Sequence, residues 1–598
     1  IAPLDAIGLQ VPGSTLALVG GDVQLEGGAV STGGGRLELG SVGDNQVVGI
    51  QAADGGLGLN YDGVSAAGTV RLSDGAIANS SGDRSGPIQI RANALEVDRS
   101  QIVAFNFGDR NGGAIDIGAE TVEFIGRNPV LTPEFINDFI SQNDFSNLPT
   151  LPPGLLVVTA GAGESGSVAV DVRQLNLSAT SFLITRSIMN GGRSGDILLN
   201  ATEAIELRAS SVLSNTSFEE IGDSGNITVN TRRLSLLDSG QIISENFSAN
   251  GRSGNVIVNA SESVSIVGVP LLVLDLGAAT NDASNAILGT GTEGLEGGDT
   301  RITTGHLSIQ QGGFVLATGV RGSQPGNITI EADTVEVTGT TPDEAASPSS
   351  ILLGTFAPEE TSLAGGDLTI VADELIVRDG GAISMDHFAF GTAGTLDITA
   401  NSIELDNGSI QTGAISGEGA NAILRAERLT LRNNSEIRGK AGSAFNVVFD
   451  FLRTGTPGDG GNLTIEADTV VALDNSDIVT TTLDDRGGRI NIEADGIFGL
   501  QARETLTNDS DIVPESRVNL EDVETVTSPD IDPQEYLVNF DTTPLNRDLL
   551  AFNCTATDGS TNRWQEATQW GITSNGKVVL VTGDETETVG WERIECDS

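Results

Sequence analysis

Apolar and polar residues alternate in short runs along this chain. Residues 326–337 (Gly-Asn-Ile-Thr-Ile-Glu-Ala-Asp-Thr-Val-Glu-Val) place two isoleucines and then two valines at every second position, on either side of Ala332. Alternation with a period of two over runs this short, bounded by Gly, Asn and Asp, predicts β-strands. A turn and a third short run follow, as in residues 406–412 (Asp-Asn-Gly-Ser-Ile-Gln-Thr). We therefore expect three short strands in every unit.

The same phrase recurs through most of the chain, which makes the sequence a repeat. Close copies begin at Gly225, Gly254, Gly366 and Gly461, and the commonest separation between units is about 27 to 30 residues. Strands this short must pair with the equivalent strands of neighbouring coils. The pattern therefore predicts an all-β fold, a right-handed parallel β-helix, and an array of β-sandwiches is the alternative. About sixteen coils at roughly 4.8 Å each give a rod on the order of 80 Å or longer.

Several segments interrupt the repeat. We assign residues 1–502 to the β-helix, with a short helical insertion near 132–146 and loop insertions at 269–296, 340–364 and 440–460. The helical insertion begins with a Thr-Pro pair, which is a helix-start signal. Loops that leave a rigid scaffold often carry binding residues, so these insertions are candidate recognition loops.

The repeat fades beyond residue 502. Residues 503–553 are rich in charge and proline, which predicts an acidic, extended strap. Residues 554–598 form a small β tail, in which Asn575-Gly576 predicts the turn of a hairpin. The only two cysteines, Cys554 and Cys596, lie in this tail. They are a candidate disulfide, and two unpaired thiols are the alternative.

The composition agrees with narrow stacked coils. Seventy-seven glycines are expected to serve corners that need a positive φ. Aromatic residues make up only 4% of the chain, which suits a core of stacked Ile, Val, Leu and Ala.

The charge balance excludes two classes of partner. Asp and Glu number 82 against 31 Lys and Arg, a net charge of -51, which repels nucleic acid and anionic membranes. Hydrophobic residues still make up 38%, which indicates a folded chain. We expect no transmembrane segment, because no apolar run is long enough to span a bilayer as a helix. The sequence begins at Ile1 in the middle of the pattern, so we expect a fragment whose export signal lies on a missing N-terminal portion.

The sequence offers no convincing catalytic constellation. Its only histidines, His306 and His387, lie in unlike settings and are expected to be solvated surface residues, which argues against a Ser-His-Asp triad or a histidine-rich metal site. Carboxylates are so numerous that a pair chosen by eye has little meaning. Residues 484–486 (Asp-Asp-Arg), with Asp468 or Asp474, are a weak candidate for a lyase site. We therefore predict no enzyme, no catalytic residue, no cofactor and no metal ligand.

The acidity of the chain makes Ca²⁺ a candidate ligand. The repeats lack the Gly-Gly-x-Gly-x-Asp spacing of calcium-binding β-rolls. Asp196, Asp299 and Asp367, which follow glycines, are expected to cap turns through bonds from side chain to backbone. The surface charge still leaves room for weak Ca²⁺ binding.

Both ends of the chain resemble a known family. Residues 8–28 (Gly-Leu-Gln-Val-Pro-Gly-Ser-Thr-Leu-Ala-Leu-Val-Gly-Gly-Asp-Val-Gln-Leu-Glu-Gly-Gly) and 35–42 (Gly-Arg-Leu-Glu-Leu-Gly-Ser-Val) resemble the stretch after the secretion domain in cyanobacterial filamentous-haemagglutinin-type exoproteins of the two-partner secretion class. Residues 528–533 (Ser-Pro-Asp-Ile-Asp-Pro) and 566–570 (Glu-Ala-Thr-Gln-Trp) are similar to the closing part of that family. The chain lacks the Thr-Gly-Arg-Gly-Gly-Leu-Pro-Pro signature expected between Cys554 and the closing segment.

The resemblance implies a large β-helix exported through a dedicated outer-membrane transporter, which would recognise the missing N-terminal domain. It also implies a protein kept at the outer cell surface or released, usually adhesive or structural. We therefore expect a secreted, non-enzymatic rod that serves adhesion, aggregation or the extracellular matrix, with surface glycans or further copies of itself as partners. One alternative is a β-helical protein that binds or cleaves polysaccharides, and a second is a self-assembling filament subunit.

Overall fold

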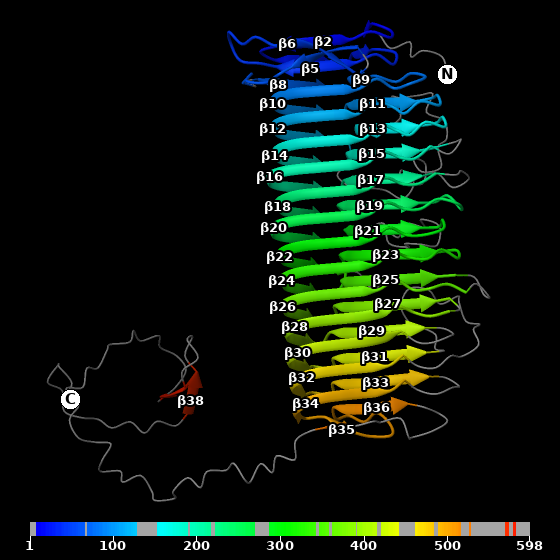
Figure 1. The fold of residues 1–598 in the computed structure, drawn as a ribbon. Helices are drawn as coiled ribbons and strands as arrows, with labels where there is room; N and C mark the ends of the chain where they lie inside the picture. The colour runs from blue at the N-terminus through cyan, green and yellow to red at the C-terminus, as the bar shows by residue number, and fades with distance from the viewer. Residues whose placement is uncertain are drawn as a thin grey trace, which may run out of the picture. The chain divides into compact units, whose positions relative to one another are not determined.

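The first part of the chain is a long stack of β-coils (Figure 1). In the computed structural model, one compact unit comprises Ile1–Pro529 and a second comprises Asp530–Ser598. All described elements are strands, and no helix occurs among the described residues. The structure describes residues 8–54, 56–65, 68–127, 152–188, 192–216, 222–268, 286–342, 346–357, 362–389, 391–414, 420–441, 461–482, 488–515, 526–527, 569–572 and 578–581.

A long and a short strand alternate along most of the first unit. The long strands are β10 (Ile88–Asp98), β12 (Ile115–Ile125), β14 (Val168–Ser178), β16 (Ile197–Arg208), β18 (Ile227–Leu237), β20 (Val256–Val267), β22 (Thr300–Gln310), β24 (Ile328–Thr338), β26 (Leu368–Arg378), β28 (Thr395–Asp406), β30 (Asn421–Arg432), β32 (Leu463–Ala472) and β34 (Ile490–Phe498). The short strands are β9 (Ile77–Asn79), β11 (Gln101–Asn106), β13 (Gly154–Thr159), β15 (Phe182–Ser187), β17 (Ser211–Thr216), β19 (Gln241–Asn246), β21 (Ile287–Thr292), β23 (Phe314–Val320), β25 (Ser350–Phe356), β27 (Ala382–Phe388), β29 (Ser409–Ala414), β31 (Glu436–Ala441), β33 (Asp477–Thr482), β35 (Gln501–Ala502) and β36 (Asp511–Glu515).

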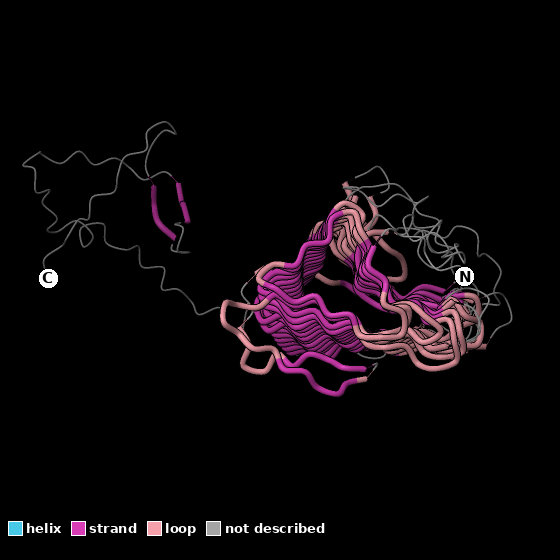
Figure 2. The backbone as a smooth tube through the Cα atoms, turned by 90° about the horizontal axis from the view of Figure 1, so that it is seen from above, coloured by secondary structure: helices cyan, strands magenta, loops and turns pink. Residues whose placement is uncertain are grey.

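Each strand pairs with its counterpart in the neighbouring coils, in parallel. The short strands form a 17-stranded sheet together with β1 (Gly8–Gln10) and β4 (Ala29–Ser31), and the long strands belong to a second continuous sheet. Along the axis of the stack the coils superpose on one another (Figure 2). The chain therefore folds as a parallel β-helix, as the repeat predicts.

The core follows the alternation in the sequence. Ile328, Ile330, Val335 and Val337 are fully buried. Equivalent positions stack on one another, since Ile328 pairs with Leu368 in the next coil. Burial of each such side chain contributes about 1.5–3 kcal/mol, so the rod depends on contacts between neighbouring coils.

The coils differ from the expectation in strand number. The first two predicted runs join into one long strand, such as β24, that bends near Ala332 without leaving the sheet. The parallel register continues on both sides of the bend and omits only Asp333. The bend leaves one residue unpaired and introduces no turn. Most coils therefore contain two strands instead of three.

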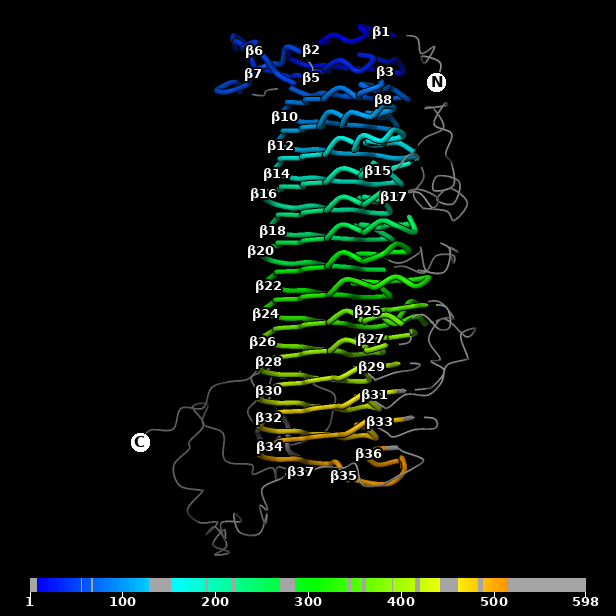
Figure 3. Tube along the Cα trace, turned by 45° about the vertical axis from the view of Figure 1, so that its right-hand side comes forward, coloured from blue at the N-terminus to red at the C-terminus, as the bar shows by residue number. Residues whose placement is uncertain are grey.

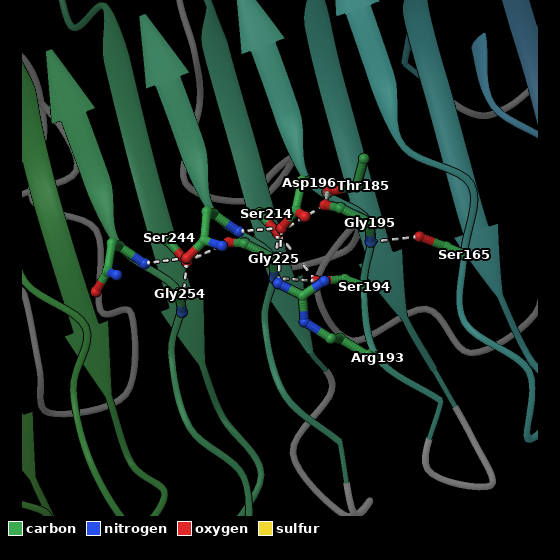
Figure 4. Close-up of polar contacts among 12 residues, drawn as sticks. Ser165, Thr185, Arg193, Ser194, Gly195, Asp196, Ser214, Gly225, Ser244 and Gly254 are labelled. Atoms are coloured by element: carbon green, nitrogen blue, oxygen red, sulfur yellow. Dashed lines mark hydrogen bonds and ion pairs between the residues drawn. The ribbon is translucent and has the colours of Figure 1, made fainter.

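The repeated glycines are required by close approach instead of by a positive φ. A Cβ atom at Gly225 would lie 2.1 Å from the carbonyl oxygen of Gly195, and one at Gly326 would lie 2.0 Å from that of Gly298. The φ angles of these glycines are not positive. Buried hydroxyl groups bond the same corner, since Gly225 N donates to both Ser194 Oγ and Ser214 Oγ at 2.9 Å (Figure 4).

Many of the positive φ angles occur at another corner, which follows most of the long strands. Asp379, Asn407 and Asp474 adopt φ angles of 55°, 53° and 56° there. Asp and Asn tolerate this left-handed conformation better than most residues, which explains why Asp and Asn recur at this position of the repeat.

The predicted insertions contain regular strands of the β-helix. β21 lies within the predicted insertion 269–296, and β25 lies within 340–364. Extra residues between the glycine phrase and the third run lengthen these units, so the regular spacing of the repeat does not reveal the strands. The expected helix at 132–146 lies outside the described residues, as do residues 269–285 and 442–460.

Strand pairing continues beyond residue 502. β36 pairs in parallel with β33, and β37 (Val526–Thr527) pairs with β34, although both lie in the predicted strap. In the second unit, β38 (Gln569–Ile572) and β39 (Val578–Val581) pair antiparallel, on either side of the residues predicted to form the hairpin turn. Cys554 and Cys596 lie outside the described residues.

Candidate functional site

A β-hairpin interrupts the coils at the N-terminal end of the stack. This end comprises β1 (Gly8–Gln10), β2 (Leu16–Gly20), β3 (Val23–Glu26), β4 (Ala29–Ser31), β5 (Leu37–Ser41), β6 (Gly49–Ala53), β7 (Gly56–Asn60) and β8 (Thr69–Ser73). β6 and β7 pair antiparallel and project from the stack (Figure 3). We name residues 49–60 the arm.

The arm is tied to the coils below it. Arg84 donates two hydrogen bonds to the carboxylate of Asp54, at 3.0 and 2.5 Å. The backbone N of Leu59 donates to Glu38 Oε1 at 3.2 Å. These bonds join the turn of the arm to the loop between β9 and β10, and the second strand of the arm to β5. The arm therefore has a fixed position relative to the sheet.

Two glycines leave space above the sheet beside the arm, and larger side chains occupy it. Arg91 on β10 pairs in register with Gly40 on β5 and with Gly118 on β12. Above Gly40 the space is filled by Tyr61, whose Oη would lie 2.3 Å from a Cβ atom there. At Gly118 the three atoms nearest to a Cβ atom all belong to the side chain of Arg91, at 3.1–3.3 Å. The Arg91 side chain therefore lies against Gly118, and the two residues form a floor beside the arm.

A cavity of about 300 Å³ occupies this floor, and we name it the arm pocket. The volume lies at the lower end of the range for small-ligand sites, about 300 to 1,000 Å³. Its lining is mostly polar and comprises Ser41, Gln51, Leu59, Asn60, Tyr61, Asp62, Val64, Gln89, Arg91 and Gly118.

Side-chain amides supply much of the hydrogen-bonding capacity of the arm pocket. Gln89 Oε1 accepts from Arg36 Nη2 at 2.8 Å, and its NH₂ group has no further bond within the described residues. Asn60 Oδ1 accepts from Asp62 N at 2.7 Å, which again leaves the NH₂ group. An amide offers two donors and one acceptor oxygen, so both side chains keep donors for a ligand.

Buried polar atoms also occur at Tyr61, in the lining of the arm pocket, and at Glu38 nearby. Tyr61 Oη and Glu38 Oε2 are both buried and have no hydrogen-bond partner within the described residues. Burial raises the pKa of Tyr61 to about 12, and the charge of Glu38 adds to the shift. Burial also raises the pKa of Glu38, against the opposing effect of Arg36. Tyr61 therefore keeps its proton across the physiological pH range.

A second polar cavity lies on the outer face of the 17-stranded sheet, and we name it the carboxylate cavity. Glu245 on β19, Glu293 after β21 and Thr318 on β23 line a space of about 10 Å³. This is room for one water molecule. Arg321 Nη1 donates to Glu293 Oε2 at 2.7 Å, while Glu293 Oε1 and Thr318 Oγ1 are buried without a partner within the described residues. Burial raises the pKa of Glu245 to about 7, and the charge of Glu293 adds to it.

The two histidines have different environments, and one prediction was wrong. His306 is a surface residue with a side chain 45% exposed, 4.0 Å from Glu336. His387 is buried at 2% exposure, and burial lowers its pKa to about 4. Its position on β27 explains the difference, because alternation turns it inward with Ile383 and Met385.

The aspartates after the glycines bond the next coil instead of capping their own turn. Asp196 Oδ1 accepts from Asn226 N at 2.7 Å, and Asp299 Oδ1 accepts from Asn327 N at 2.9 Å. Asp367 Oδ1 accepts from Thr395 N at 2.8 Å. The predicted bond type was correct and its partner was wrong, because the stack brings the next coil closer than the following turn.

Other surface charges are engaged in ion pairs or spread along a shallow groove. Arg173 bridges Glu120 and Glu203, and Arg233 bridges Glu203 and Glu262, which forms an alternating ladder along the long-strand sheet. Among the described residues, no group of three or more His, Cys, Asp or Glu is placed to hold a metal ion. An open groove near the other end is lined by Arg425, Glu427, Glu466, Asp468, Glu493 and Asp495, with small side chains between them.

The weak lyase candidate is not assembled in the described residues. Asp468 lies in the open groove, whereas Asp474 forms a positive-φ corner. Residues 484–486 lie outside the described residues.

The fold and this geometry define the chain as a parallel β-helix with one pocketed arm. Comparison with protein-family models, with curated proteins and with solved structures found no match for this chain. Within the part of the chain that the structure describes, no helix could cross a membrane.

Sequence reasoning missed both cavities. The arm had a usable signal, because Asp54-Gly55 is a favoured hairpin turn between two runs of alternating residues. Glu293 had none, since it follows a strand that the insertion had disguised. For His387, the parity of the strand Ala382–Phe388 was sufficient to predict an inward side chain.

Proposed function

We propose that this protein is a non-enzymatic extracellular rod that serves adhesion, with glycans on other cells or in the matrix as its partners. The observation that carries the proposal is the arm pocket, a polar cavity of about 300 Å³ held by a tied hairpin on a stack of regular coils. A stiff stack suits the presentation of a binding site away from a surface, because each coil is fixed by both neighbours.

The composition supports an extracellular setting for the proposal. A net charge of -51 keeps the chain soluble and separate from nucleic acid and anionic lipid. The resemblance to filamentous-haemagglutinin-type exoproteins adds export by a two-partner transporter and a location at or beyond the outer cell surface. Both remain part of the proposal.

A second candidate is a polysaccharide-cleaving β-helix, which the carboxylate cavity favours. Glycoside hydrolysis usually requires two carboxyl groups, one of which has a raised pKa and acts as the acid, and the pKa values of Glu245 and Glu293 are both raised. The cavity beside them holds about 10 Å³, however, and Glu293 already bonds Arg321. A sugar ring does not fit there, so we rank cleavage second.

Binding of the purified chain to an array of algal and bacterial glycans, with and without Ca²⁺, tests the proposal. The expected result is saturable binding without release of cleavage products. Failure to bind any glycan under both conditions would remove glycan adhesion, and release of shortened glycans would establish the second candidate instead.

A further inference from the structure

We infer that the arm pocket binds a neutral sugar residue, held between the amides of Gln51 and Asn60 on the arm and Gln89 on the sheet. This inference rests on the proposed function, since it assigns glycan recognition to one site. Gln51 and Asn60 share the face of the arm that lies over the coils, and Gln89 lies on β10 below them. The three amides therefore line the same cavity from two sides.

The chemistry of these amides matches that of sugar hydroxyl groups. A hydroxyl both donates and accepts, and a side-chain amide can do either. Gln51 makes no side-chain hydrogen bond within the described residues, and Asn60 and Gln89 each use only their oxygen. Several hydroxyl groups of one sugar ring can therefore be bonded without breaking any bond of the protein.

The charges around the arm pocket favour a neutral ligand. Arg91 is the one cationic side chain in the lining, and it already bonds Asp116, with Nη1 donating to the backbone oxygen at 3.1 Å. Asp62 adds a carboxylate to the lining, and Glu38 behind Tyr61 is already paired with Arg36. A uronic acid or a sulfated sugar would meet the Asp62 carboxylate and no free cation.

The arm pocket is also formed before a ligand arrives. The Arg84–Asp54 and Leu59–Glu38 bonds fix the arm, and Gly118 and Arg91 form the floor. A site that needs no ordering on binding loses less free energy to association. A monosaccharide makes few contacts and binds weakly. Its binding is therefore measurable only if little free energy is lost in ordering the site.

Saturation-transfer NMR on the full chain tests the inference with D-glucose, D-galactose, D-mannose and L-fucose. D-glucuronate and D-galacturonate serve as acidic comparators. We expect saturation transfer to at least one neutral sugar and weaker transfer to the acidic ones. Gln51→Ala should weaken the affinity about threefold to tenfold, the effect of one lost hydrogen bond.

Gly118→Leu should abolish the signal by filling the floor. Thr303→Leu is its matched control, because Thr303 is an exposed residue in the same outward column of the long-strand sheet, several coils away. A neutral-sugar signal that persists in Gly118→Leu and Gln51→Ala, or no transfer to any neutral sugar, would overturn the inference. Preferred binding of the uronic acids would overturn it as well. If the array still shows glycan binding in these cases, the proposed function stands and only the site is wrong.

Discussion

The arm pocket and the carboxylate cavity are both lined by polar groups on outer faces of the same solenoid, but they are opposite in character. The arm pocket is about 300 Å³, has three side-chain amides in its mostly polar lining and has an arm above it. The carboxylate cavity is about 10 Å³ and contains two carboxyl groups that burial disfavours as anions. In this solenoid a pocket forms where an extra element, the arm, lies over small residues. The pKa values of carboxyl groups are raised where these groups are packed among apolar residues.

The two sites should be structurally independent, because each coil contacts only its neighbours. Leu39 on β5 and Leu288 on β21 are both fully buried, so Leu→Ala at either should cost about 2–5 kcal/mol locally. We expect Leu39→Ala to speed hydrogen–deuterium exchange in β2, β5 and β10 while β19–β23 stay protected. Leu288→Ala should give the reverse. Equal loss of protection at both sites for either variant would refute independence.

The carboxylate cavity should make its surroundings less stable at high pH. Glu245 ionises near 4.5 when unfolded and near 7 when folded, so its stabilising contribution is complete below pH 4.5 and is lost as the pH rises through 7. Glu245→Gln should therefore protect β19–β23 better than wild type at pH 8, by at most about 3 kcal/mol, and differ little at pH 4. Parallel exchange profiles for the two proteins at both pH values would contradict this.

His387 gives a pH signature of the opposite sign in the same sheet. Its pKa is about 4 when folded and 6.5 when unfolded, so its contribution is complete above pH 6.5 and is lost as the pH falls through about 4. Protection of β25–β29 should drop by up to about 3 kcal/mol between pH 7 and pH 4, and less in His387→Leu. Asp386, beside it on the outer face, has a pKa raised to about 6 and acts in the other direction. The difference between wild type and variant isolates the histidine.

The smallest expected effect is at the arm. Arg84→Ala removes an ion pair whose partner Asp54 is largely exposed, so the free energy should change by about 1 kcal/mol or less. Exchange should accelerate in β6 and β7 and in no core strand. Arg301→Ala, which removes the exposed pair with Glu331, is the matched control and should leave the arm unchanged. An unaltered arm in Arg84→Ala would mean that the other bonds alone fix it.

The sequence predicted the repeat, the inward face and the C-terminal hairpin, because these depend on local alternation and on one turn signal. Ile328 and Val337 could be assigned to the core from parity alone. The close approach of Gly225 to Gly195 and the bonds of Asp196 to the next coil required knowledge of how coils stack. The two cavities depend on residues far apart in sequence, such as Gln51 with Gly118 and Glu245 with Glu293, so no local pattern could reveal them.

One measurement separates the two sites most directly: a single glycan library incubated with wild type, Gly118→Leu and Glu245→Gln, with bound glycan and newly released reducing ends recorded together. The account predicts binding by wild type and Glu245→Gln, loss of binding in Gly118→Leu, and no released ends in any sample. Released ends that depend on Glu245 would contradict it and would make the carboxylate cavity the functional site.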